Sequence, residues 1–240
     1  MKKLSFLIVL LSINVSANSI LIKSGQINDG LGNSFIGDIL IVDEKIVEVG
    51  KFLNSSSAKI IEAKGKPVTP GLISPISNIG VVEINALDVT NDDSPDFFGP
   101  GFSVFNAFNP HSTLIPWNRS NGVTSSISTP GYSSQIFKGM GSFYLLDGDI
   151  DITGNADVAM YARLGAIGGS RAETIQIMES MFGLALNKDE LELEELLGTT
   201  FASSMDMQLQ DIQALSRVVN REIPLVLEVN RATVSYTHLT

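Results

Sequence analysis

The chain has 240 residues, of which 44% are hydrophobic and 18% charged. These proportions are typical of a globular protein long enough for one large or two small domains. The net charge of −10 argues against a nucleic-acid partner, because phosphate contacts need clustered Lys and Arg. The lack of Cys excludes disulfides, thiolate metal sites and a cysteine nucleophile.

Residues 1–17, MKKLSFLIVLLSINVSA, have the pattern of a bacterial signal peptide. Two Lys residues precede an apolar run of about a dozen residues, and small residues precede Ala17. We therefore expect a periplasmic or secreted protein that is cleaved near Ala17. The alternative is a membrane anchor, but the apolar run is shorter than the roughly 20 residues that a span needs. Beyond this segment the sequence predicts no contact with a membrane.

Residues 18–66 alternate between apolar and polar positions and are interrupted by Gly and Asn-Asp pairs. This pattern predicts short strands joined by tight turns. Asp43 and Glu44 separate two β-rich runs, where a hairpin turn belongs. We interpret the segment as a small β-sandwich module that is too short to close by itself.

In residues 67–233, strands alternate with helices, a pattern that predicts βαβ units and a parallel sheet. Ser170 and Glu173 predict a capping box at the start of one helix, and Asn187 with Glu190 predicts the same for the next. Further predicted elements are a short helix before residue 123, a helix at 207–219, and strands at 70–77, 123–128, 141–148 and 224–229.

The last residues, 234–240, read VSYTHLT and resemble a translated sequencing-adapter tail. The alternative is a genuine loop. If the tail is an artefact, the chain is a truncated reading frame and His238 has no functional role.

His111 is the one histidine outside this tail, and it lies in a loop sequence rich in Asn, Pro and Ser. It could act as a base if a carboxylate from the preceding acidic loop oriented it, although a loop histidine is more often structural or solvated. That acidic loop, which contains Asp93 and Asp96, offers oxygen ligands suited to calcium but lacks the EF-hand spacing. A solvated loop is the simpler interpretation.

The passage from Ile20 to Ile73 ends in KPVTPGLI after an Asp-Glu-Lys-Ile hairpin, and it resembles the N-terminal part of the amidohydrolase superfamily. The later stretches VFNAFNPHSTLIPWNRSNGVTS and IPLVLEVNRA are similar to an exported, imidazolonepropionase-like branch of that superfamily. The resemblance extends to Ala232. It implies an α/β fold, namely a partial (β/α)8 TIM-type barrel preceded by the small β-sandwich module.

The resemblance also implies metal-assisted hydrolysis of carbon–nitrogen (non-peptide) bonds in small cyclic amides, with zinc or a similar ion supplying hydroxide. The family holds its metals with a His-x-His at the end of the first barrel strand and with later histidines. In this chain the first pair falls on Ile76 and Asn78, and a later pair falls on Glu228 and Asn230. Ile76 has no donor atom, and an amide oxygen is a poor zinc ligand. Glu228 alone is left as a weak metal ligand.

Three interpretations remain open at this point. The first is a hydrolase by descent whose metal site has degraded or moved elsewhere in the protein. The second is a non-catalytic relative in the periplasm that binds a small molecule, pairs with an active amidohydrolase partner, or forms a homo-oligomer. The third is a β-rich periplasmic interaction protein, for which the barrel resemblance is incidental. The residues expected around the pocket are Ile76, Asn78, His111, Glu228, Asn230 and Arg231.

Overall fold

The computed structural model describes residues 18–164, 170–189 and 192–229. The chain divides into two compact units, Met1–Pro70 and Gly71–Thr240. The predicted signal peptide, the tail 234–240 and the pair Asn230–Arg231 lie outside the described residues. Within the described part, no helix is both long and apolar enough to cross a membrane.

The first unit is built on one five-stranded sheet in the order β3-β2-β1-β4, with β5 also paired to β1. Its strands are β1 (Ser19–Asn28), β2 (Ser34–Val42), β3 (Lys45–Gly50), β4 (Lys59–Glu62) and β5 (Pro67–Val68). The β2–β3 hairpin turns at Asp43 and Glu44, which have φ angles of 46° and 66°. A two-residue hairpin turn of the commonest type needs a positive φ at both of its central residues. The sequence prediction of a turn at these residues is confirmed.

All the described strands of this unit belong to a single hydrogen-bonded sheet. The sheet carries an apolar hollow of about 610 Å³. Ile39, Ile41 and Val49 are among the residues that line the hollow. The described residues do not confirm the predicted β-sandwich, because they contain no second sheet in this unit.

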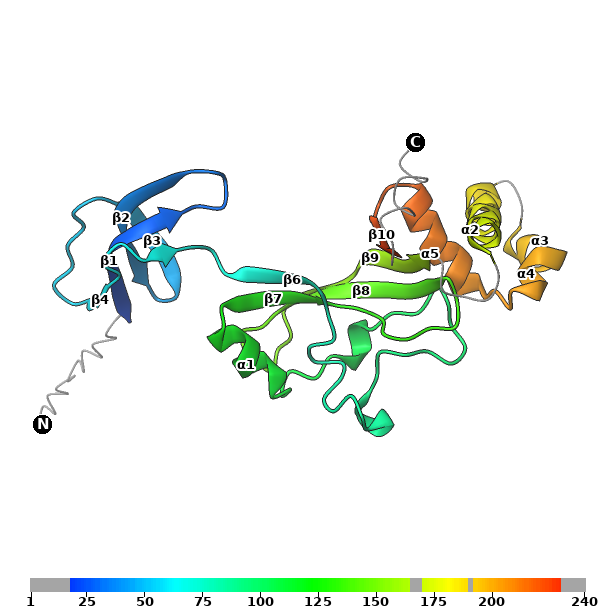
Figure 1. Ribbon diagram of the computed structural model, residues 1–240, viewed down its shortest axis with the longest axis horizontal. Helices are drawn as coiled ribbons and strands as arrows, with labels where there is room; N and C mark the ends of the chain where they lie inside the picture. The colour runs from blue at the N-terminus through cyan, green and yellow to red at the C-terminus, as the bar shows by residue number, and fades with distance from the viewer. Residues whose placement is uncertain (1–17, 165–169, 190–191, 230–240) are drawn as a thin grey trace, which may run out of the picture. The chain divides into compact units, whose positions relative to one another are not determined.

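The second unit is an α/β structure around a second five-stranded sheet (Figure 1). Its strands are β6 (Leu72–Ser77), β7 (Val123–Ser128), β8 (Phe137–Leu145), β9 (Gly154–Leu164) and β10 (Leu225–Val229). Its helices are α1 (Leu114–Ser120), α2 (Arg171–Leu186), α3 (Leu193–Leu197), α4 (Thr200–Ser204) and α5 (Leu209–Val219), with short 3-10 turns η1 (Asp88–Thr90), η2 (Phe105–Ala107) and η3 (Asn187–Asp189).

The strands of this sheet follow the order β10-β9-β8-β7-β6. The pairs β6–β7 and β9–β10 are parallel, but β8 runs antiparallel to both of its neighbours. The prediction of a wholly parallel sheet is thus wrong at β8, and the strand β9 was not predicted. The physical reason is that the loops 129–136 and 146–153 contain no crossover helix, and short loops join antiparallel neighbours.

The sheet is curled like part of a barrel. The Tyr161 hydroxyl on β9 donates a hydrogen bond of 2.8 Å to the Pro75 carbonyl on β6, which lies three strands away in the sheet order. Gly141 on the intervening strand β8 leaves room for the tyrosine ring, because a Cβ there would lie 2.6 Å from Tyr161 Cε2. This contact across the sheet joins β9 directly to the strand that precedes the predicted site.

Helices α2 and α5 pack together near β9 and β10 (Figure 1). Met160, Ile212 and Leu215 are fully buried in the main core of this unit. The Ser170 side chain accepts a hydrogen bond from Glu173 N and caps α2, which confirms the Ser170 half of the predicted capping box. Asn187 ends α2 and begins the 3-10 turn η3, while the predicted capping pair of Asn187 with Glu190 is not tested because Glu190 lies outside the described residues.

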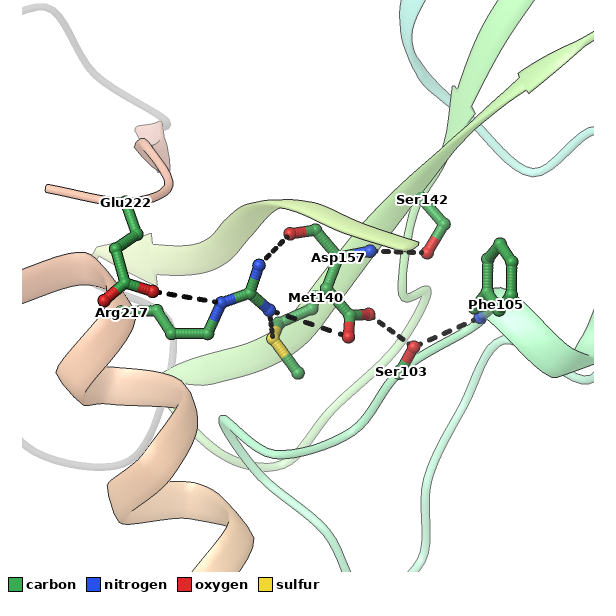
Figure 2. Close-up of polar contacts among 7 residues, drawn as sticks. All are labelled: Ser103, Phe105, Met140, Ser142, Asp157, Arg217 and Glu222. Carbon is green, nitrogen blue, oxygen red and sulfur yellow. Dashed lines mark hydrogen bonds and ion pairs between the residues drawn. The ribbon is translucent and has the colours of Figure 1, made fainter. Parts of the chain in front are cut away.

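A polar network fixes the amino-terminal half of β9 to its surroundings (Figure 2). Asp157, at a φ of 53°, accepts a hydrogen bond from Ser103 Oγ at 2.5 Å, and its backbone amide donates to Ser142 Oγ. Arg217 of α5 donates to the Asp157 carbonyl at 3.0 Å and pairs with its carboxylate at 3.7 Å. In barrels this end of the strands serves stability, so we assign the network a structural role.

Candidate site at the carboxyl ends of the strands

The strands β6, β7, β9 and β10 all end at one edge of the sheet, and the reversed strand β8 begins there. Barrel enzymes place their chemistry at this edge. The edge carries an open hollow of about 400 Å³. The hollow is lined by Ile76, Ser77, Asn78, Asp93, Thr129, Pro130, Gly131, Tyr132, Lys138 and Arg163.

A cluster of three charged side chains lies at this edge. Lys138 Nζ is 2.7 Å from Glu228 Oε1, and Arg163 Nε is 3.5 Å from Glu228 Oε2. The Lys138 side chain is only 7% exposed, so its charge needs this partner. Both oxygens of the Glu228 carboxylate are therefore engaged by cations.

Strand register explains how the three charges meet. Glu228 and Arg163 are direct partners on the parallel strands β10 and β9. The pairing of β8 with β9 shifts between Phe137 and Gly139, and Gly139 adopts a φ of 122°. Such a bulge changes the direction of a side chain, and here it falls at Lys138.

The chain turns sharply after β6. The amides of Val81 and Val82 both donate to the Asn78 carbonyl, and Gly80 adopts a φ of 78° that favours glycine. Ser77 Oγ lies 3.0 Å from Ser126 Oγ of β7, and the amide of Thr129 donates to the Ser77 carbonyl. These bonds hold the end of β6 against β7 and place Asn78 on the wall of the hollow.

Tyr161 lies next to the charged cluster and is 1% exposed. Burial, with a smaller contribution from the negative charge of Glu228, raises the pKa of the Tyr161 hydroxyl to about 12. The group therefore stays protonated at neutral pH and keeps its hydrogen bond to the Pro75 carbonyl.

The structure brings together three of the residues singled out from the sequence. Ile76 and Asn78 line the hollow, and Glu228 contacts two further residues of its lining. His111 does not line the hollow. It is exposed in the loop before α1, and its backbone amide donates to Asn109 Oδ1. Asn230 and Arg231 lie outside the described residues.

Sequence reasoning missed Lys138 and Tyr161. The signal for Lys138 was present, because a single charged residue inside the apolar run FKGMGSFYL must be paired when it is buried. Nothing local marked its partner, which is 90 positions away along the chain. The role of Tyr161 likewise depends on a strand far away in the sequence.

The donor set does not fit a zinc ion. Ile76 has no donor atom, Asn78 offers a neutral amide, and the Glu228 carboxylate is occupied by two cations that would repel a metal. Among the described residues, no group of three His, Asp or Glu side chains lies close enough together to hold a metal ion. What the hollow offers instead is a set of polar and charged groups suited to hydrogen bonding.

Comparisons with known sequences give short matches to two enzymes. A segment of 57 residues is 47% identical to 5-methylthioadenosine/S-adenosylhomocysteine deaminase of Thermococcus onnurineus (strain NA1), and 56 residues are 43% identical to dihydroorotase of Lactococcus lactis subsp. lactis (strain IL1403). Each match covers 23% of this chain but only 13% of the relative. No family model matches the chain.

The fold has a solved counterpart. The crystal structure of an amidohydrolase from Thermotoga maritima MSB8 matches 91% of this chain with a TM-score of 0.69. The chain spans 60% of that structure, and the 23% sequence identity shows a common fold alone. The second comparison therefore shows that this chain shares the fold of that amidohydrolase over most of its length.

Proposed function

We propose that the chain descends from hydrolases of carbon–nitrogen bonds in small cyclic amides and now binds a small polar molecule at its barrel mouth, with feeble or no hydrolysis. The descent is supported by the segments that match a deaminase and a dihydroorotase. The fold likeness to an amidohydrolase agrees with it.

One observation supports the proposal that the chain no longer binds a catalytic metal ion. Glu228, the strongest metal-ligand candidate of the sequence, is held between Lys138 and Arg163. A divalent cation at Glu228 would have to displace two cations and would then lie beside their positive charges, which costs free energy in a partly buried site. The same groups can bind a polar ligand without any metal.

Metal analysis of the complete gene product tests this proposal. After dialysis we expect less than one zinc per chain and little or no hydrolysis of cyclic amides such as hydantoin. Replacing residues 76, 78, 228 and 230 with His should raise the metal content if the remaining ligands are supplied elsewhere in the protein. Two tightly bound metal ions in the unmodified protein would refute the proposal.

We make three more specific proposals, which concern the family branch, the location in the cell and the fold of the first unit. We place the chain in the imidazolonepropionase-like branch because of the stretches around His111 and Arg231. We propose export to the periplasm because of the signal-peptide pattern in residues 1–17. We also propose that the sheet of the first unit is one layer of a β-sandwich, since its apolar hollow is suited to packing against a second layer.

N-terminal sequencing of the protein purified from its native host tests the proposed export. The mature chain should begin near Asn18. Recovery of a chain that still starts at Met1 from the cytosolic fraction would refute export.

A further inference from the structure

One wall of the hollow is positively charged. Arg163 lines the hollow, its side chain is 27% exposed, and it reaches Glu228 only through Nε. Within the described residues, no hydrogen bond engages its two terminal nitrogens. A guanidinium presents paired N–H groups that match a planar carboxylate. Arg163 can therefore receive the carboxylate of a ligand without releasing Glu228.

Another part of the wall is negatively charged. Asp93 lines the same hollow, is 9% exposed, and accepts a hydrogen bond from Ser94 Oγ at 3.0 Å. Its carbonyl accepts from the amide of Gly131, where a Cβ would lie 2.2 Å from Asp93 Oδ2. Glycine at this position thus leaves space for the carboxylate. No cation pairs with Asp93 in the part of the chain that the structure describes.

The charges around the hollow balance each other before any ligand binds. Lys138 and Arg163 contribute two positive charges, while Glu228 and Asp93 contribute two negative ones. A purely anionic or purely cationic ligand would leave one unbalanced charge in a site that is partly shielded from water. A ligand with both charges places its carboxylate at Arg163 and its ammonium at Asp93, so each end is paired.

We infer that the hollow binds a small zwitterion that carries a carboxylate and an ammonium group, which is the product class of the hydrolysis of lactams (cyclic amides with one ring nitrogen bonded to one carbonyl), in preference to the neutral ring. In that reaction the oxygen of water bonds to the carbonyl carbon, the carbon–nitrogen bond breaks, and the protons of water end on nitrogen, which leaves a carboxylate and an ammonium in one molecule. The hollow of about 400 Å³ has room for one such molecule. The inference rests on the proposed function, because that function supplies the cyclic amide.

Four matched compounds test the inference by titration calorimetry on the full-length protein. The compounds are 5-aminopentanoate, its ring form δ-valerolactam, pentanoate and pentylamine. We expect 5-aminopentanoate to bind about tenfold more tightly than each of the other three, since only it pairs both ends. Equal affinity for pentanoate, tighter binding of the lactam, or no binding of 5-aminopentanoate would each overturn the inference.

Two variants assign the two ends of the ligand. Arg163→Gln should weaken the binding of 5-aminopentanoate and pentanoate alike. Asp93→Asn should weaken the binding of 5-aminopentanoate and pentylamine but not that of pentanoate. Arg171→Gln and Asp96→Asn change exposed residues outside the hollow and serve as matched controls, so they should leave both affinities unchanged. If Asp93→Asn does not alter the preference for the zwitterion, the inference is wrong.

The experiments distinguish failure of this inference from failure of the proposed function. Tight binding of two metals would refute the proposed loss of metal chemistry even if the zwitterion binds. Failure of 5-aminopentanoate to bind in a protein that holds little zinc would refute only the assignment of the ligand class.

Discussion

At the scale of single residues, Gly141 leaves the space that the Tyr161 ring occupies when its hydroxyl bonds to the Pro75 carbonyl across the second sheet. A Cβ at position 141 would lie 2.6 Å from the tyrosine ring and 3.1 Å from the Ser128 carbonyl. Gly141→Ala should therefore lower the free energy of unfolding by about 1–3 kcal/mol, as overpacking does. Urea denaturation measures the change.

Gly183 provides the matched control for this substitution. It lies within α2, and a Cβ there meets nothing within 4 Å outside the helix. Gly183→Ala should raise the free energy of unfolding by about 0.5–1 kcal/mol, because alanine favours helix. Equal effects at the two positions would show that Gly141 is not required for the position of the ring.

The same tyrosine makes stability depend on alkaline pH. Burial raises the pKa of Tyr161 from its ordinary 10.0 to about 12. A group whose pKa is raised on folding stabilises the protein fully below its unfolded pKa, and this contribution is lost as the pH rises toward the folded value. Between pH 10 and 12 the free energy of unfolding should fall by at most roughly 1.4 kcal/mol per pH unit from this residue.

Tyr161→Phe should make the pH profile of urea denaturation flatter above about pH 10, since phenylalanine does not titrate. It also removes the bond to the Pro75 carbonyl and should cost about 1 kcal/mol at neutral pH. Tyr132→Phe is the control, because Tyr132 is 70% exposed. Burial raises the pKa of Tyr144 too, so part of the slope should persist in both variants. An unchanged slope in Tyr161→Phe would contradict the prediction.

At the scale of elements, α2 depends on its cap. Ser170 Oγ accepts a hydrogen bond of 3.2 Å from Glu173 N, which satisfies one of the free amides of the first turn. Ser170→Ala should lower the free energy of unfolding by about 1 kcal/mol. Among the described residues, the Ser180 hydroxyl donates only to the Gln176 carbonyl of the same helix, so Ser180→Ala should have little effect. Thermal unfolding followed by circular dichroism compares the two variants.

At the scale of the whole molecule, the second sheet has two unpaired edges among the described residues, at β6 and β10. Ile73 on β6 is 61% exposed. Because an open apolar edge strand pairs with other chains, we expect the 240-residue chain expressed alone to self-associate as its concentration rises. Light scattering coupled to size-exclusion chromatography measures the association.

Ile73→Lys should reduce this association, since a charged side chain on an edge strand opposes pairing. Val89→Lys is the matched control, because Val89 is 83% exposed but lies in η1, away from both edges. A monomeric wild-type chain with a sharp, cooperative thermal transition would contradict the prediction.

The sequence by itself determined the features whose signals are local. The turn at Asp43 and Glu44, the Ser170 cap and the strand Val123–Ser128 depend on residues a few positions apart, and all three are confirmed. The end of β6 was also recognisable, because the KPVTPGLI phrase precedes it. Local propensity and turn chemistry are sufficient for such features.

Only the tertiary structure decided the reversal of β8 and the composition of the site. The Lys138–Glu228 bond joins residues 90 positions apart, and it depends on the register of three strands and on a bulge that no local pattern marks. The hydrogen bond from Tyr161 to Pro75 spans 86 positions for the same reason. Pairing register between distant strands is set by the packing of the whole sheet, so the sequence could name Glu228 but not its pairing with Lys138 and Arg163.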